Sequence, residues 1–422
     1  MRICPNLKIA PLTPSYFHST KNVDLRAVNR ICAELLFTNT GMPIENGIVE
    51  CDTSGKILRV LAPGDESYST DGALFIEGWV CAGFINAHCH LELSHHKNRI
   101  AEQTGLDGFI DALGRCETNL EAQLFAMQEA DRDMQCEGIV AVIDICNTTA
   151  SFAVKAQSNL QYHSLIERFG ILDSAANTSN EKGLDLLQTL CKTYKLDGNL
   201  TPHAPYSLSP ALGKKIKASF ASHPGIYSIH FMESAGETEL FASGSGPMAN
   251  RLRSWGFFAD GFPHTQTTPL DFIRDSLPEN TPLLFVHNTY LDKPSLNALK
   301  TMPNRVYFAL CPRANLYIEN RLPDLHLLTA NQAKIVVGTD SLASNYSLSI
   351  LEELKALQFA FPEISIEQLL IWSSKNAAEL LGKADELGSI EAGKRPGLVQ
   401  IANVDKVSKK LIKSSFAKQI CM

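Results

Sequence analysis

The stretch "VCAGFINAHCH", residues 80–90, decides where the main sheet of this chain begins. Small and apolar residues run through it and stop at His88-Cys89-His90, which predicts a buried strand with histidines at its end. Further apolar runs follow along the chain. The predicted strands are Val80–Ala87, Ile139–Ile145, Tyr162–Phe169, Gly198–His203, Tyr227–Met232, Pro282–Asn288, Val306–Cys311 and Ile335–Asp340.

Helical stretches between these strands set the fold class. Leu120–Cys136 is one, Pro210–Ser222 has Ser209 as its N-cap, and Ser349–Phe361 and Ile366–Leu381 carry apolar residues at helical spacing. Several strands are apolar on both faces, which is typical of a parallel sheet covered by helices. The alternation therefore predicts an α/β fold, a (β/α)8 TIM barrel. Periodicity alone also allows an open doubly wound sheet, although the GxGxxG marker of a Rossmann fold is missing.

The two ends of the chain have a different pattern. Residues 31–80 predict short strands around the turn Asp52-Thr53-Ser54-Gly55, and "LGSIEAGKRPGLVQIAN" near the C-terminus predicts a second strand-turn-strand unit. We therefore expect a small β-sandwich domain built from residues 31–80 and 386–412, with the barrel at 81–385. Residues 1–30 predict a poorly ordered N-terminal extension without the apolar core of a secretory signal.

Composition excludes several classes of partner. The net charge of -7 does not indicate a basic surface that would bind nucleic acid. The chain has no apolar run of about 18 residues, so the sequence predicts no membrane span. The 11 cysteines form no CxxC pair, which predicts buried thiols in a reducing cytoplasm and no disulfide framework.

Polar side chains end many of the predicted strands. In a barrel, the carboxyl ends of the strands face one mouth, so these side chains would converge there. They are His88 and His90 on the first strand, His203 on the fourth, His230 and Glu233 on the fifth, His287 on the sixth, and Asp340 on the eighth.

These residue types point to a metal site. The HxH spacing on an extended strand places His88 and His90 on the same side. A third histidine and an aspartate complete a nitrogen-and-oxygen shell that suits Zn²⁺, or less often Fe²⁺ or Mn²⁺. Such an ion lowers the pKa of a bound water toward about 7. Glu233 is placed to shuttle protons, and His287 to orient the water.

Other histidines have simpler explanations. A lone histidine at a strand end is more often structural than a ligand, so the prediction rests on the whole series. His95 and His96 lie beside Lys97 and Arg99, which predicts a solvated loop. Two roles are open for Glu92: it binds a polar group of a substrate, or it holds its own loop in place. Structural roles are expected for His163, His223, His264 and His326, and Cys89 is expected to be packed away from the HxH face.

Five short motifs together resemble the amidohydrolase superfamily, and more closely its cytosine/guanine/adenosine-analogue deaminase branch, which includes chlorohydrolases. They are "GFINAHCH", "TPHAPYS", "IHFMES", "VHN" and "GTDSLASN", and "GSIEAGKRPGLVQI" resembles the C-terminal strand pair of that branch. The likeness runs from about residue 31 to 405. Two positions depart from the usual pattern, Met232 in "HFME" and Pro396-Gly397 in "GKRPGLV".

The resemblance implies specific roles. His88, His90, His230 and Asp340 would bind one ion per chain, because the lysine that bridges two metals in related enzymes has no counterpart in "NLTPHAPYS". Catalysis would involve Glu233 as proton shuttle, with His287 and Asp340 positioning a metal-bound hydroxide that attacks the amino-bearing ring carbon and releases ammonia. The substrate would contact His203, Glu233 and, in one reading, Glu92.

The substrate is less sharply implied. "HCHLELSH" resembles the motif of aminofutalosine deaminases of menaquinone biosynthesis, so aminodeoxyfutalosine is the first expectation within the class of aminopurine bases and nucleosides. Guanine, adenosine and S-adenosylhomocysteine are alternatives, as is a chlorohydrolase or amide-ring hydrolase. A non-catalytic scaffold is a third hypothesis, which the complete ligand set disfavours.

Two rim loops, residues 91–113 and 234–271, are expected to recognise the substrate. Phe257, Phe258 and Phe262 in the second loop would form a hydrophobic lid or simple surface packing. A homodimer is compatible with a helix-covered barrel, but no sequence feature indicates it.

Overall fold

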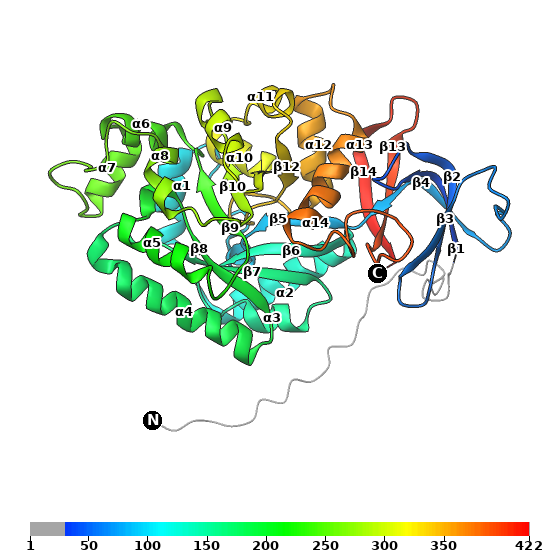
Figure 1. Ribbon diagram of the computed structural model, residues 1–422, viewed down its shortest axis with the longest axis horizontal. Helices are drawn as coiled ribbons and strands as arrows, with labels where there is room; N and C mark the ends of the chain where they lie inside the picture. The colour runs from blue at the N-terminus through cyan, green and yellow to red at the C-terminus, as the bar shows by residue number, and fades with distance from the viewer. Residues whose placement is uncertain (1–29, 422) are drawn as a thin grey trace.

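The structure is a computed structural model that describes residues 30–421. Its strands form one six-stranded sheet and two four-stranded sheets (Figure 1). The predicted extension lies outside the described residues, apart from Arg30 at the start of the first strand.

Strands from both ends of the chain share the six-stranded sheet, which we call the terminal sheet. Its order is β14-β13-β4-β1-β2-β3. The bounds are β1 Arg30–Phe37, β2 Ile44–Cys51, β3 Ile57–Leu61, β4 Leu74–Ala82, β13 Leu398–Asp405 and β14 Lys410–Cys421. β13 pairs antiparallel with β4, so residues 398–401 lie beside residues 79–82. β14 continues past residue 412, where the predicted segment ends. The sandwich and the division into domains stay predictions.

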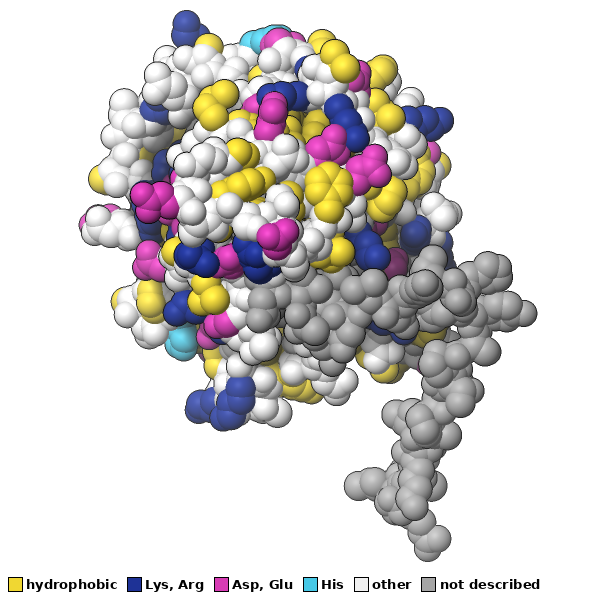
Figure 2. Space-filling view, turned by 90° about the vertical axis from the view of Figure 1, so that its right-hand side faces the viewer, with side chains coloured by type: hydrophobic (Ala, Val, Ile, Leu, Met, Phe, Trp, Pro, Cys, Tyr) yellow, Lys and Arg dark blue, Asp and Glu magenta, His cyan; other side chains and the backbone are white. Residues whose placement is uncertain are grey.

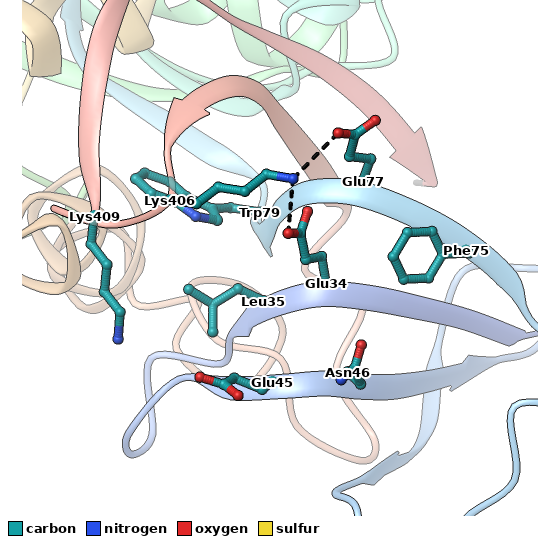
Figure 3. Close-up of a pocket in the computed structure, with 9 residues that line it drawn as sticks. All are labelled: Glu34, Leu35, Glu45, Asn46, Phe75, Glu77, Trp79, Lys406 and Lys409. Carbon is teal, nitrogen blue, oxygen red and sulfur yellow. Dashed lines mark hydrogen bonds and ion pairs between the residues drawn. The ribbon is translucent and has the colours of Figure 1, made fainter.

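Figure 3 shows one face of the terminal sheet, where a pocket is lined by residues of β1, β2, β4 and the β13–β14 turn. Lys406 in this turn lies 2.8 Å from Glu34 Oε1 and 3.3 Å from Glu77 Oε1. The lysine thus ties the C-terminal turn to β1 and β4. No residue that lines this pocket comes from the two four-stranded sheets.

The two four-stranded sheets contain parallel strands only, in the orders β5-β6-β7-β8 and β12-β11-β10-β9. Their bounds are β5 Phe84–Cys89, β6 Ile139–Cys146, β7 Gln161–Arg168, β8 Asp197–Pro202, β9 Tyr227–Phe231, β10 Leu283–His287, β11 Val306–Leu310 and β12 Lys334–Val337. Every residue of β6, β9 and β10 is buried, as expected for parallel strands covered on both faces. The predicted parallel α/β architecture is confirmed, and closure into a barrel stays a prediction.

The first predicted strand, Val80–Ala87, is wrong as a single strand. Gly83 separates β4 in the terminal sheet from β5 in the parallel sheet. A Cβ atom at Gly83 would lie 2.4 Å from Val140 Cγ1 and 2.6 Å from the Pro396 carbonyl oxygen, so the chain needs glycine where it passes between the sheets. The apolar run hides this break, because residues on both sides of it are buried.

The two parallel sheets contact each other at both edges. On one edge, the backbone amides of Thr339 and Asp340 each donate to the His88 carbonyl at 3.0 Å, just beyond β12. On the other, Thr201 Oγ1 of β8 donates to the Ser228 carbonyl of β9 at 2.6 Å and accepts from the Ser228 amide at 2.8 Å. We refer to these contacts as the β5–β12 seam and the β8–β9 seam.

Helices flank the parallel strands, with α2–α5 beside β6–β8 and α9–α12 beside β10–β12 (Figure 1). Their bounds are α1 Gly105–Arg115, α2 Leu120–Cys136, α3 Phe152–Gln157, α4 Ala176–Thr193, α5 Pro210–Ser219, α6 Ala235–Ser243, α7 Gly246–Ser254, α8 Pro269–Ile273, α9 Lys293–Lys300, α10 Pro312–Glu319, α11 Leu325–Ala330, α12 Ile350–Ala360, α13 Ile366–Leu370 and α14 Asn376–Leu380. Ser209 caps α5 as predicted, accepting from the Leu212 amide. The predicted helix Ile366–Leu381 is interrupted by a π-helical turn, Ile371–Lys375.

The surface agrees with the composition. Over the part of one face that Figure 2 colours by residue type, Lys and Arg side chains are interspersed with Asp and Glu. Within residues 30–421, no helix combines the length and the apolar character that crossing a bilayer requires. Cys81, Cys89, Cys146 and Cys311 are buried thiols.

Candidate active site

The HxH pair lies where β5 ends at the β5–β12 seam. His88 is within the strand and His90 follows it, and both are buried. Their Nε2 atoms lie 3.1 Å apart. The turn after the pair is held because the Leu91 amide donates to Asp144 Oδ1 of β6 at 2.8 Å. Cys89, between the two histidines, is packed in the hydrophobic core as predicted.

His230 and Asp340 complete a cluster around this pair. His230 Nε2 of β9 lies 3.3 Å from His90 Nε2, and Asp340 Oδ1 lies 3.5 Å from His90 Nε2 and 3.8 Å from His88 Nε2. Ser344 Oγ donates to Asp340 Oδ2 at 2.5 Å and so fixes the other carboxylate oxygen. The polar side chains at the ends of the first, fifth and eighth predicted strands thus lie together.

The donor set fits a zinc ion. His88, His90 and Asp340 form a group that could hold a metal, and His88 and His230 belong to a second such group with His287. Tetrahedral zinc with bonds of about 2.0–2.1 Å separates its nitrogen ligands by roughly 3.3 Å, which matches the Nε2 separations of 3.1 and 3.3 Å. His230 Nδ1 lies 2.9 Å from the His203 carbonyl oxygen, so this nitrogen carries the proton and Nε2 is free to accept a metal.

Burial keeps the site histidines neutral. It is the main cause that lowers the pKa of His230 to about 3 and that of His203 to about 4, and neighbouring histidines lower both further. Burial also lowers the pKa of His88 and His90 well below the ordinary value. Neutral imidazoles are the form that binds metals, so no proton has to leave at neutral pH.

Glu233 and His287 lie on one side of this cluster. Glu233 Oε1 is 3.5 Å from His287 Nε2, and His287 Nδ1 is 3.5 Å from Asn315 Oδ1. Burial raises the pKa of Glu233 well above its ordinary range, and the charges of Asp340 and Glu319 add to the effect. A raised pKa is the direction that suits a carboxyl to general acid catalysis.

Backbone strain concentrates around these residues. His287 has φ +72° and Asp340 has φ +57°, and Met232, directly before Glu233, has φ +47°. The left-handed region is unfavourable for residues with a side chain and is seen most often where the surrounding structure enforces it. Met232, noted above as a departure from the family pattern, is buried in this turn.

His203 lies next to His230 but outside the metal-facing group. Its ring centroid is 4.9 Å from that of His230, and its Nδ1 is 2.7 Å from Ser207 Oγ. Its side chain is half-buried, and its role in contacting a substrate stays a prediction. Tyr206 packs edge-on against the same ring at 5.7 Å.

Glu167 was missed by the sequence reasoning. It lies near the end of β7, and its Oε1 is 3.6 Å from His230 Nδ1 while Oε2 accepts from Asn147 Nδ2 at 2.9 Å. Glu167, His203 and His230 form a further group of metal-binding types, but the proton on His230 Nδ1 argues against a second ion there. The rule applied to the other strands, a charged residue at the end of an apolar run, also selects "LIER" and would have found Glu167.

The structure places Glu92 toward the loop after β6. Its Oε2 accepts from the Asn147 amide at 3.0 Å and from the Thr148 amide at 3.2 Å, and Ser151 Oγ donates to Oε1 at 3.3 Å. These contacts favour the reading in which Glu92 holds its loop, and its substrate role stays a prediction.

The expectation of a solvated loop at His95 and His96 is wrong for His96. Both residues end a 3₁₀ helix, Leu91–His96, their ring centroids are 3.8 Å apart, and His96 is buried. The short helix turns His96 inward although Lys97 and Arg99 beside it are polar.

The two rim loops pack against each other. Phe262 is buried and Phe257 and Phe258 are half-buried, in one apolar cluster that also contains Leu106 and Phe109 of α1. This packing joins residues 91–113 to residues 234–271. Their role in substrate recognition stays a prediction.

The other histidines lie outside the cluster. His163 Nε2 is 2.9 Å from Asn199 Oδ1, and the ring of His264 packs on Phe262 and Phe272. His223 and His326 are exposed. The groups that could hold a metal among residues 30–421 include none of these four.

The chain belongs to the amidohydrolase family, whose model matches residues 79–420. It is therefore a hydrolase that acts on carbon–nitrogen bonds, and the resemblance inferred from the motifs is confirmed. An adenosine deaminase of Helicobacter pylori is 27% identical over 331 residues, covering 77% of this chain and 79% of the relative. An aminodeoxyfutalosine deaminase of Nitratiruptor sp. is 26% identical over 325 residues, covering 74% and 76%.

A solved structure supports the fold. The crystal structure of Helicobacter pylori aminofutalosine deaminase in complex with methylthio-coformycin superposes with a TM-score of 0.76 at 24% identity, covering 90% of this chain and 93% of that one. The likeness therefore extends over both the terminal sheet and the parallel sheets.

Proposed function

We propose that this chain is a metal-dependent hydrolytic deaminase of an adenosine-like nucleoside. The observation that carries the proposal is the buried carboxyl of Glu233, 3.5 Å from His287 and beside a cluster of three histidines and an aspartate. Its curated relatives include an adenosine deaminase and an aminodeoxyfutalosine deaminase, and "HCHLELSH" favours aminodeoxyfutalosine as the substrate. The chain would then serve menaquinone biosynthesis.

His88, His90, His230 and Asp340 would hold one Zn²⁺, with Fe²⁺ or Mn²⁺ as alternatives. A divalent ion in such a site makes a water molecule nucleophilic at neutral pH. Glu233 would give its proton to the ring nitrogen next to the amino-bearing carbon, so that carbon becomes more electrophilic. The same carboxylate would then receive a proton from the water and pass it to the leaving amine, and the remaining hydroxyl proton would return to Glu233 as the ring carbon becomes a carbonyl. His287 would orient the water, and His203 would contact the ring of the substrate.

The fold supports this arrangement if the two parallel sheets form one barrel. Hydrogen bonds at the β5–β12 and β8–β9 seams favour closure, and the proposed ligands come from β5, β9 and the end of β12. We propose this barrel as the catalytic domain, beside a small domain formed by both chain ends. A cytoplasmic location and a homodimer stay predictions, and a small-molecule substrate is the partner that the site favours.

Ammonia release tests the proposal. Purified, zinc-loaded protein should release ammonia from aminodeoxyfutalosine, adenosine or S-adenosylhomocysteine, and a chelator should abolish the release. Guanine and a chlorinated triazine serve as substrates for the alternative activities. If no aminopurine releases ammonia although one metal is bound per chain, the proposed deaminase activity is contradicted. Chloride or amide-ring hydrolysis is then favoured.

Glu233→Gln tests the proton transfer. General acid–base catalysis contributes about 10²–10⁴-fold, so kcat should fall by this amount while the metal content stays the same. Glu181→Gln, an exposed carboxylate on α4, is the control and should leave kcat unchanged. Near-wild-type turnover in Glu233→Gln would show that another group moves the proton.

A further inference from the structure

Glu237 is a buried carboxylate that the proposed chemistry does not use. It lies in the first turn of α6, four residues after Glu233, and is 0% exposed. Its side chain turns back along the chain, and Oε2 accepts from the Glu233 backbone amide at 3.2 Å. Burial raises the pKa of Glu237 to about 8, although the hydrogen bond from the Glu233 amide lowers it. Among the described residues, Oε1 has no hydrogen-bond partner.

An ordinary capping role does not account for these contacts. In the motif S-x-x-E, the glutamate at the third helical position bonds to the amide of the capping serine. Ser234 caps α6 by accepting from the Glu237 amide at 3.2 Å. The Glu237 carboxylate, however, passes the Ser234 amide and accepts from the Glu233 amide before it. It therefore acts on the segment that carries Glu233.

That segment is strained and is held from two sides. Met232 has φ +47°, so the peptide leading into Glu233 is in the left-handed region. On the side of β10, the Tyr290 amide donates to the Met232 carbonyl at 2.8 Å. On the side of α6, Glu237 Oε2 accepts from the Glu233 amide at 3.2 Å. The two contacts together fix the direction in which the Glu233 side chain leaves the backbone.

We propose that Glu237 is a positioning residue that aims the Glu233 carboxyl at His287 and the metal cluster. The inference rests on the proposed role of Glu233 in proton transfer. Without Glu237, the turn at Met232 relaxes and the carboxyl of Glu233 shifts from its place 3.5 Å from His287 Nε2. The metal ligands do not depend on this turn, because His230 precedes it within β9.

A double-mutant cycle with Glu233→Gln tests the proposal on the full-length, metal-loaded enzyme. A misplacement of about 1 Å can cost 10²-fold, so Glu237→Ala should lower kcat by roughly 10- to 100-fold with KM and metal content near wild type. Glu237→Gln keeps one acceptor oxygen and should lose less. In the Glu233→Gln background, Glu237→Ala should cause no further loss, because the group that it positions is already gone.

The matched control is Glu352→Ala. Glu352 occupies the same position in α12, where Ser349 is the cap and accepts from the Glu352 amide at 3.4 Å. It should leave kcat unchanged, so a loss confined to Glu237→Ala is not a general effect of removing a capping-box glutamate.

The outcomes separate the inference from the function on which it rests. An equal loss from Glu237→Ala with and without Glu233, or a loss that follows metal content, overturns the inference alone. If Glu237→Ala does not fold, the cycle with Glu237→Gln decides by the same criteria. A wild-type enzyme that releases no ammonia, or an active Glu233→Gln, overturns the proposed function and the inference with it.

Discussion

Glu353 connects α12 to the loop that carries Asp340. It is fully buried, and its Oε1 accepts from Asn345 Nδ2 at 2.7 Å while Oε2 accepts from the Arg313 amide at 2.9 Å. Asn345 Nδ2 also donates to the Thr339 carbonyl at 2.9 Å. One side chain thus holds the segment from which a proposed metal ligand projects.

This buried carboxyl should make the free energy of unfolding depend on pH. Burial raises the pKa of Glu353 to about 8 in the folded protein from 4.5, the usual value, so between pH 4.5 and 8 the folded state binds a proton that the unfolded state has lost. The Glu353 contribution to stability therefore falls as pH rises, by up to ~1.4 kcal/mol per pH unit. Glu353→Gln removes the titrating group. Relative to wild type, the variant should become steadily more stable from pH 5 to 8 in urea unfolding.

The neighbouring Glu352→Gln is the control for this measurement. Glu352 is partly exposed and lies 2.6 Å from Lys355 Nζ, so this variant controls for the loss of a carboxylate from the same helix without the loss of a fully buried one. A stability difference between Glu353→Gln and wild type that stays constant over this pH range would exclude a buried titrating carboxyl at Glu353.

At the level of single residues, position relative to the strands made most of the site predictable. His88, His230, His287 and Asp340 lie in or just after apolar strands, and the structure brings them to one cluster. Glu237 could not be predicted, since "SAGE" has the pattern of an ordinary helix cap and its contact with the Glu233 amide depends on the turn at Met232. The burial of His96 was not predicted, because the polarity of the neighbouring residues does not show which side chains of a short 3₁₀ helix face the interior.

At the level of elements, the break between β4 and β5 makes Gly83 sensitive. In Gly83→Ala, the new Cβ would meet Val140 Cγ1 and the Pro396 carbonyl oxygen well inside van der Waals contact. Overpacking of this kind typically costs about 1–3 kcal/mol. We expect Gly83→Ala to lower the free energy of unfolding by this amount in urea titration.

Gly41→Ala is the matched control, because a Cβ there has no atom within 4 Å. It should leave the free energy of unfolding close to that of wild type. Equal stability of Gly83→Ala and Gly41→Ala would mean that the two strands separate without the close approach at Gly83.

The sequence failed to predict element boundaries in two situations: where an apolar run continues across a break, and where polar residues lie between the apolar residues of a strand. Pattern located the parallel strands because each apolar run is bounded by polar residues. The pattern merged β4 with β5, because no polar residue marks the break at Gly83. It also missed the π-helical turn Ile371–Lys375, because the apolar residues of this turn fit an α-helix as well as a π-helix. β14 has lysines and serines between its apolar residues, as a strand on the edge of a sheet commonly does, and its length was therefore missed.

At the level of the whole molecule, the proposed metal site lies where the two parallel sheets meet. His88 and the loop of Asp340 form the β5–β12 seam, and the His230 amide donates to the His203 carbonyl at 2.9 Å next to the β8–β9 seam. His88 and His90 belong to one sheet, and His230 and Asp340 to the other or its end. An ion held by all four would link the sheets across both seams.

Metal removal should therefore destabilise the whole fold as well as abolish activity. A ligand at 1,000 times its Kd contributes about 4.1 kcal/mol, and a large protein gains roughly 2–4 °C in Tm per kcal/mol, so chelation should lower Tm by on the order of 10 °C. Added zinc should restore it. Asp340→Asn, which weakens the site while keeping the side-chain size, should start from the lower Tm and respond less to the chelator. If metal analysis shows complete removal of the ion while Tm stays constant, the four residues do not link the two sheets through a metal.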